Sequence, residues 1–161
     1  MKINNLRSLL IHELQDIYDA EHRIHKELES MEKSAHANDV KELFKSHREE
    51  TQGQIERLEK TFELLGEKAQ RTTCEATKGL IEEAKELLSE IEDDATSDAA
   101  LIAAAQKVEH YEIASYGTVA AWAHILDQDQ CSRLLNQTLE EEKSADKKLM
   151  HAASKLNLVA L

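Results

Sequence analysis

Apolar residues recur every three or four positions along almost the whole chain, and no proline interrupts them. This spacing places apolar side chains on one face of an α-helix, and a chain without proline can continue such helices over many turns. Aromatic residues, which favour strands, make up 4 % of the chain, whereas Leu, Ala, Glu and Lys are abundant. We therefore expect an all-α fold, with residues 1–161 in a single domain, a length that suits one core.

The pattern predicts four long helices and one short helix. The long helices are expected at residues 3–35, 39–65, 98–126 and 128–156. Gly66 is placed to cap the second of them, and a Thr-Ser-Asp sequence at residues 96–98 to cap the start of the third. A capping-box pattern at residues 72–75 opens the short helix, which is expected to end near residue 92.

The lengths of the connections predict the topology. A few residues near His36 join the first two long helices, and a few near Asp127 join the last two, so each pair is expected to form an antiparallel hairpin. About 30 residues separate the hairpins, enough to cross the length of a bundle with the short helix on the outside. Two hairpins joined by one long crossover give a ferritin-like antiparallel four-helix bundle.

Acidic residues occupy seam positions that their neighbours fill with aliphatic side chains. The seam of the first helix contains Glu21, that of the third Glu109 and Glu112, and that of the fourth Glu142 and Asp146. A single acid of this kind is ordinarily a solvated residue on a helix face. The coincidence of five on three seams favours a buried site instead.

The second helix is less regular, with His47 on its apolar face and Glu50 toward the edge of that face. Glu21, Glu50, Glu112 and Glu142 each lie about 14 or 15 residues from the turn of their own hairpin, so at 1.5 Å per residue they meet near mid-bundle. His47 is either a ligand or a hydrogen-bonded core histidine. His25, one turn after Glu21, is a weaker alternative ligand.

Carboxylates left unpaired in a dry core cost several kcal/mol each, which a stability of about 5–15 kcal/mol cannot absorb. The seams carry no Lys or Arg at this level, so either some acids are protonated or bound cations balance them. Two divalent ions bridged by carboxylates meet this need, and oxygen ligands with some imidazole suit iron or manganese. The predicted metal ligands are Glu21, His47, Glu50, Glu109, Glu112, Glu142 and Asp146.

Three segments resemble the YciF/YciE-type family, which comprises bacterial stress proteins with a ferritin-like fold: HELQDIYDAEHRI, SHREETQGQIERLEKTFELLGEKAQRTTCEATKGLIEEA and KVEHYEIASYGTVAAWA. The resemblance extends over essentially the whole chain. The Glu-His-Tyr-Glu sequence at residues 109–112, with Tyr116 following, is also similar to the third-helix motif of rubrerythrins, in which both glutamates bind iron. These resemblances imply that Glu21 and both glutamates of the motif are ligands.

The second and fourth helices depart from the wider ferritin pattern, which has Glu-x-x-His on both. Glu50 is followed at that spacing by glycine and Glu142 by alanine. His47 lies three residues before Glu50, and Asp146 lies one turn after Glu142. Acids therefore take the places of histidines, which leaves the metal and its redox behaviour open.

The chain has a formal net charge of −12, with 32 % charged residues. Such a surface repels nucleic acid and anionic membranes, neither of which is an expected partner. The sequence shows no signal-peptide pattern, no apolar run of about 18 residues and no Cys-x-x-Cys pair. We expect a cytoplasmic protein that forms a homodimer.

Two classes of function fit these observations. The first is a di-iron or di-manganese carboxylate protein that handles peroxide, oxygen or iron, with an oxidase or peroxidase-like activity as one form of it. The second is a non-enzymatic helical dimer that acts through partner binding and whose metal site is structural or vestigial. Metal content separates the two classes first, and turnover with hydrogen peroxide second.

Overall fold

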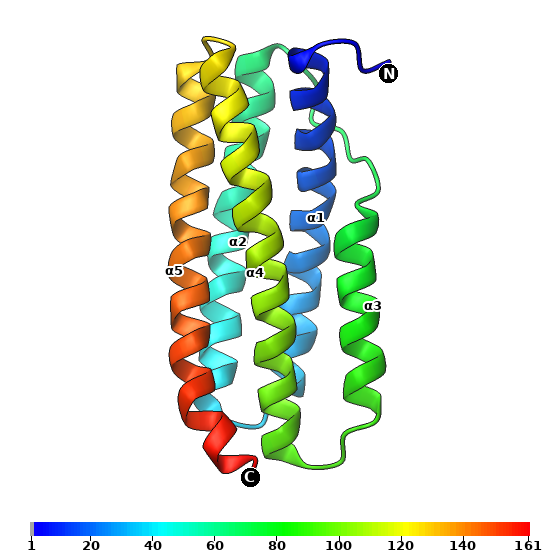
Figure 1. Cartoon of the computed structure of the whole chain (residues 1–161), viewed down its shortest axis with the longest axis vertical. Helices are drawn as coiled ribbons and strands as arrows, with labels where there is room; N and C mark the ends of the chain where they lie inside the picture. The colour runs from blue at the N-terminus through cyan, green and yellow to red at the C-terminus, as the bar shows by residue number, and fades with distance from the viewer. Residues whose placement is uncertain (1) are drawn as a thin grey trace.

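The computed structural model describes residues 2–161, which form five α-helices and no β-strand (Figure 1). The helices are α1 (Leu6–Ser34), α2 (Asn38–Leu65), α3 (Glu75–Ser89), α4 (Asp94–Ile125) and α5 (Asp129–Val159). The prediction of an all-α chain with four long helices and one short helix is confirmed. Within this part of the chain, no helix combines the length and the apolarity needed to cross a membrane.

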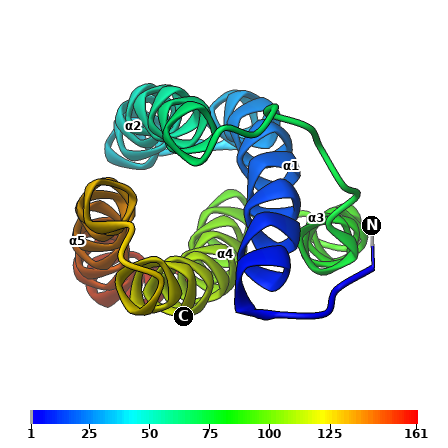
Figure 2. The ribbon, with the colours of Figure 1, turned by 90° about the horizontal axis from the view of Figure 1, so that it is seen from above.

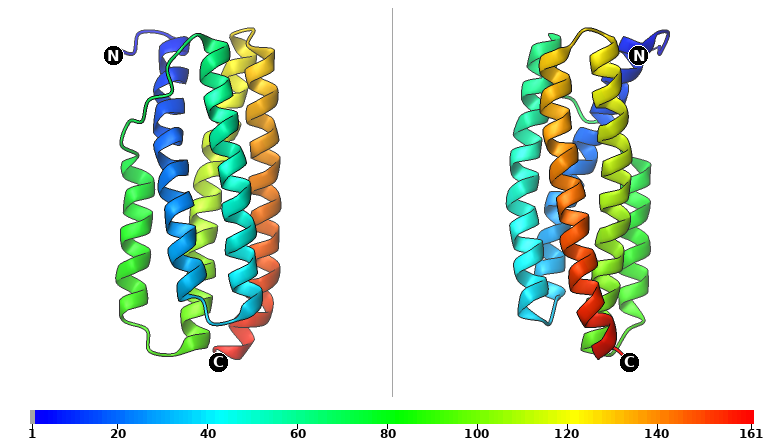
Figure 3. Two further views of the ribbon diagram at one scale, coloured as in Figure 1. Left: turned by 180° about the vertical axis from the view of Figure 1, so that it is seen from behind. Right: turned by 60° about the vertical axis from the view of Figure 1, so that its left-hand side comes forward.

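Four of the helices surround the core, and α3 lies outside them. Helices α1 and α2 form one antiparallel hairpin, and α4 and α5 form another (Figures 1 and 3). The hairpins pack through α1 against α4 and through α2 against α5, while α3 rests on α1 and α4 (Figure 2). The connection from α2 to α3 descends along the outside of the bundle, so that α3 runs alongside α1 (Figure 3).

The apolar core has two clusters with a polar layer between them. One cluster includes Leu10, Leu14, Leu58, Phe62, Tyr116, Val119 and Leu135, and the other includes Ile24, Leu28, Val40, Phe44, Leu101, Ile102 and Leu149. Each large side chain buried in this way contributes about 1.5–3 kcal/mol. The fold is therefore held on both sides of the polar layer, in which Glu21, His47, Glu109, Glu112 and Glu142 lie.

The start of α4 differs from the prediction. The helix begins at Asp94, and its cap is Asp93, whose carboxylate accepts the backbone N–H of Thr96 at 2.8 Å. The expected cap at residues 96–98 was wrong because Asp98 is already inside the helix. Its carboxylate is buried and accepts the backbone N–H groups of His36 and Ala37, at 2.8 and 2.7 Å, in the turn between α1 and α2.

The short helix also begins differently. Its cap is Cys74, whose sulfur accepts the backbone N–H of Thr77 at 3.4 Å, so the capping box at residues 72–75 was wrong. The preceding segment is fixed to α1 instead, because the carboxylate of Asp19 accepts the Cys74 N–H and the Arg71 guanidinium, both at 2.9 Å. The helix ends at Ser89 rather than near residue 92. Gly66 caps α2 in the left-handed conformation at φ 71°, as predicted.

Candidate metal centre

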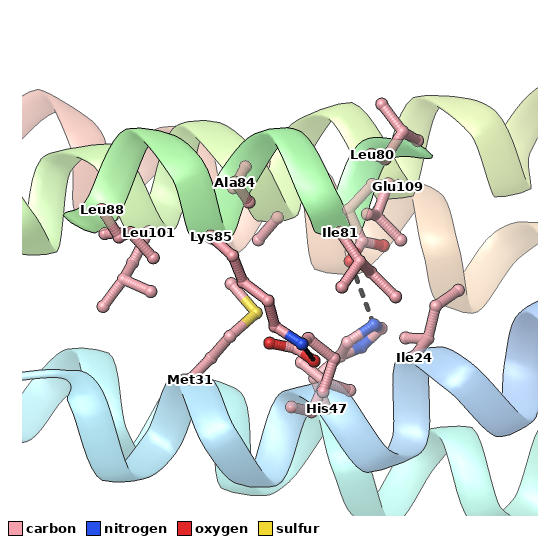
Figure 4. Close-up of a pocket in the computed structure, with 15 residues that line it drawn as sticks. Ile24, Met31, His47, Leu80, Ile81, Ala84, Lys85, Leu88, Leu101 and Glu109 are labelled. Carbon is pink, nitrogen blue, oxygen red and sulfur yellow. Dashed lines mark ion pairs between the residues drawn. The ribbon is translucent and has the colours of Figure 1, made fainter. Parts of the chain in front are cut away.

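Four buried side chains converge in the polar layer between the two apolar clusters. His47 comes from α2, Glu109 and Glu112 from α4, and Glu142 from α5. One potential ligand atom from each lies within 4.8 Å of the others. His47 and Glu109 face each other in Figure 4. The spacing of the two glutamates, three residues apart, puts both on the inner face of α4.

The atoms that converge lack ordinary partners. His47 Nε2 lies 3.0 Å from Glu109 Oε1 and 3.9 Å from Glu142 Oε2, yet within residues 2–161 neither ring nitrogen makes a hydrogen bond of acceptable geometry. Both oxygens of Glu112 and one oxygen each of Glu109 and Glu142 are likewise unpartnered. Buried polar groups are nearly always hydrogen-bonded in native proteins, so this set requires an explanation.

Glu21 of α1 lies beside these four residues. It is fully buried, and the Tyr116 hydroxyl donates a hydrogen bond to its Oε1, while its Oε2 has no partner among the described residues. Burial raises the pKa of Glu21 to about 7, against the opposing effects of the Tyr116 hydrogen bond and the charge of His47. Glu109 adds to the rise by repulsion.

The pKa values of Glu112 and Glu142 are shifted in the same direction as that of Glu21. Burial raises the pKa of Glu112 well above its ordinary value, and the charges of Glu142, Glu21 and Glu109 raise it further. Burial does the same to the pKa of Glu142. For His47, burial acts to lower the pKa, but the neighbouring carboxylates outweigh it and hold the pKa well above its ordinary value. The polar layer thus favours bound protons or other cations.

Two of the predicted ligands lie at the edge of this layer. Glu50 is partly exposed, with Oε2 3.5 Å from His47 Nδ1 and Oε1 3.4 Å from Lys148 Nζ. Asp146 is largely buried, and its Oδ1 lies 3.4 Å from Nε2 of His110. The structure therefore brings four of the seven predicted ligands into one cluster, sets Glu21 against it, and places Glu50 and Asp146 at its periphery.

Two further residues position the acids and were missed as site residues. Gln54 is fully buried, and its amide donates hydrogen bonds to Glu142 and, at 3.3 Å, to Glu141. Tyr116, which the sequence indicated only as part of a motif, donates a hydrogen bond to Glu21. The seam of α2 runs through His47, Thr51 and Gln54. Because residues seven positions apart lie on the same face of a helix, the spacing from His47 could have indicated that Gln54 faces the core.

The fold and the site together define a class of protein: a helical bundle with a buried cluster of one imidazole and three carboxylates between its helices. The chain belongs to the family described as domain of unknown function DUF892, whose model matches residues 5–159. It is 44 % identical to protein YciF of Escherichia coli strain K12 over 154 residues, which cover 95 % of this chain and 93 % of the relative. The resemblance to the YciF-type family is confirmed.

Solved structures agree with this assignment. The crystal structure of the E. coli stress protein YciF matches with a TM-score of 0.92 at 43 % identity, over 96 % of this chain and 98 % of the other. YcfI from Rhodopseudomonas palustris matches with a TM-score of 0.90 at 49 % identity, over 92 % and 94 %. A Xanthomonas campestris protein at 20 % identity has a TM-score of 0.78 over 96 % and 95 %, which shows a shared fold.

Proposed function

We propose that this chain is a ferritin-like di-metal carboxylate protein that binds iron or manganese and handles peroxide, oxygen or iron in a stress response. The observation that carries the proposal is the convergence of ligand atoms from four buried residues, His47, Glu109, Glu112 and Glu142, within 4.8 Å of one another. Most of the nitrogen and oxygen atoms of these side chains have no hydrogen-bond partner among residues 2–161. Cations in this layer remove both the repulsion between the acids and the cost of their unpartnered oxygens.

The donor set fits the proposed ions. Carboxylate oxygens with one imidazole suit iron and manganese, whereas sites dominated by thiolates suit zinc or copper(I). The four converging residues would be the main ligands, Glu21 a fifth, and Glu50 and Asp146 the ligands at the edge. Bound ions supply Lewis-acid and redox chemistry.

The residues around the acids have their own roles in this proposal. Gln54 holds one oxygen of Glu142, which leaves the other, Oε2, on the side of His47. Tyr116 donates to one oxygen of Glu21 and supplies a proton there. Such outer partners orient ligands and adjust their basicity.

The fold and the relatives support the wider role. Two antiparallel hairpins joined by one long crossover are the arrangement of ferritin-like bundles. Both protein YciF and its crystal structure match almost the whole chain, and that protein is described as a stress protein. A role in stress is therefore the expectation for this chain.

Elemental analysis of protein purified without chelator tests the proposal. We expect about two iron or manganese ions per chain, the number that two carboxylate-bridged sites hold. A content below about 0.2 of any transition metal, with no uptake on titration, contradicts the proposal, because a site of this donor set binds such ions. That result would leave the non-enzymatic, partner-binding function as the better description.

A further inference from the structure

An apolar pocket leads from the surface beside α3 to the metal centre. It lies between α1, α3 and α4, and has a volume of about 40 Å³ (Figure 4). Its inner end is formed by His47 and Glu109. The rest of the wall is almost entirely apolar: Ile24, Leu28, Met31, Leu80, Ile81, Ala84, Leu88, Leu101, Ala104, Ala105 and Val108.

Helix α3 covers this pocket. Leu80, Ile81, Ala84 and Leu88, at helical spacing, form the wall on the α3 side, and the helix lies outside the four core helices (Figures 2 and 4). At the outer edge, the exposed Lys85 ammonium pairs with the Glu27 carboxylate of α1 at 2.7 Å. The crossover helix therefore contributes an apolar wall and an ion pair to a passage that ends at the proposed ligands.

We infer that this pocket is the binding and entry site for dioxygen, a small uncharged and apolar molecule. The inference rests on the proposed function. A cavity of about 40 Å³ exceeds the roughly 10–15 Å³ that one water needs and is well below the roughly 150 Å³ of a cavity that holds benzene. The occupant is therefore a molecule of few atoms.

The lining selects among small molecules. Dioxygen loses no hydrogen bonds when it leaves water for an apolar wall. Hydrogen peroxide carries two hydroxyl groups, and each unpaired hydroxyl costs about 2–7 kcal/mol on such a transfer. A metal cation loses far more when it leaves its hydration shell. The pocket thus favours dioxygen over peroxide and over iron itself.

The reaction that dioxygen would undergo in the iron-loaded protein balances without another reductant. Two ferrous ions held by the proposed ligands would supply two electrons, one each, and would become ferric. One dioxygen molecule would gain these electrons together with two protons from solvent and leave as hydrogen peroxide. The O–O bond is kept, and two O–H bonds form.

A first experiment uses the metal-free protein and dissolved dioxygen, whose paramagnetism accelerates the relaxation of nearby methyl protons. Leu101 lines the pocket and Leu135 lies in the other apolar cluster, and they are equally buried, at 0 % and 1 % exposure. We expect the Leu101 methyl groups to relax faster than those of Leu135 as the oxygen pressure rises. Equal relaxation of the two overturns the inference.

A second experiment narrows the pocket in the iron-loaded protein. Ala84→Phe fills it from α3, and Leu87→Phe is the matched control because Leu87 lies on the same helix, is exposed and does not line the pocket. We expect Ala84→Phe to slow dioxygen consumption about tenfold, equivalent to about 1.4 kcal/mol on the barrier, and Leu87→Phe to leave it unchanged. Ala104→Leu narrows the same pocket from α4. If it also slows dioxygen consumption, the effect of Ala84→Phe does not come from displacement of α3 by the larger side chain.

The outcomes separate the two proposals. Iron content is measured for every variant, and a wild-type protein without iron contradicts the proposed function. Variants with normal iron content and unchanged dioxygen consumption overturn the entry route. If Ala84→Phe slows the reactions with dioxygen and with hydrogen peroxide equally, the pocket does not select dioxygen, and that assignment is wrong.

Discussion

Glu112 is the acid with the least support from the protein around it. Neither of its side-chain oxygens has a hydrogen-bond partner within the part of the chain that the structure describes, although the side chain is 2 % exposed. Burial raises its pKa, and the charges of Glu142, Glu21 and Glu109 raise it further. A cation shared with the neighbouring acids, as proposed above, would stabilise a carboxylate in this position.

We predict that Glu112→Ala loses at least one metal equivalent per chain while the helical content is retained, because bundle stability comes mainly from apolar packing. Elemental analysis and far-UV circular dichroism provide the two measurements. Glu140→Ala is the control, since Glu140 is an exposed glutamate on α5 that pairs with Lys143. Metal binding by the Glu112 variant equal to that of wild type would mean that Glu112 is not a ligand.

Within the candidate site, the sequence indicated which acids are buried better than which acids lie at the rim, for a geometrical reason. Glu21, Glu109, Glu112 and Glu142 follow aliphatic seams, and all four are buried. On α2, Thr51 lies about 40° to one side of His47 at 100° per residue and is buried, whereas Glu50 lies about 60° to the other side, at the edge of the buried face. Glu50 therefore points toward the rim of the polar layer, where Lys148 meets it.

Among the elements, α4 is tied to the first hairpin by one buried carboxylate. Asp98 accepts the N–H groups of His36 and Ala37, which precede α2 and have no partner inside that helix. A capping side chain is ordinarily sought next to the helix that it caps. Here it comes from residue 98, about 60 residues later in the chain, so no local pattern could have revealed it. Because residues 96–98 resemble a local cap, the sequence placed the start of α4 at residue 98 rather than at Asp94.

We predict that Asp98→Ala lowers the free energy of unfolding by about 1–3 kcal/mol, because two backbone N–H groups lose their hydrogen bonds to a buried carboxylate. Chemical denaturation measures the change. Asp94→Ala is the matched control one turn earlier on the same helix: its carboxylate is exposed and faces the exposed His36 ring at 3.4 Å, so we expect a change within about 0.5 kcal/mol. Equal losses in the two variants would contradict the proposed role of Asp98.

At the scale of the whole molecule, the polar layer makes stability depend on pH. A carboxyl whose pKa is higher in the folded chain than in the unfolded chain stabilises the fold fully below its unfolded pKa, and loses that contribution as the pH rises through the folded pKa. Glu21, with a pKa raised to about 7, and Glu112 and Glu142, with pKa values raised well above the ordinary range by burial, all act in this direction. The raised pKa of His47 has the same sign.

We therefore predict that the metal-free protein has a higher melting temperature near pH 5 than near pH 8. Excess manganese should reverse the trend, because the ion competes with protons for the same oxygens and binds the folded state. Thermal melting across this range, first with chelator and then with manganese, measures both effects. Identical pH profiles in the two conditions would show that the acids do not form a shared site.

The proposed ligands are divided between the two halves of the chain. Glu21 and His47 belong to the first hairpin, whereas Glu109, Glu112 and Glu142 belong to the second, and one stretch of backbone, residues 66–93, connects them. A break in that stretch would leave each hairpin with its own short turn, and every bond from metal to protein would then help to join two separate molecules. The two apolar clusters would still draw the halves together, and bound metal would tighten their association, so the ions would take over part of the linking that the backbone had done.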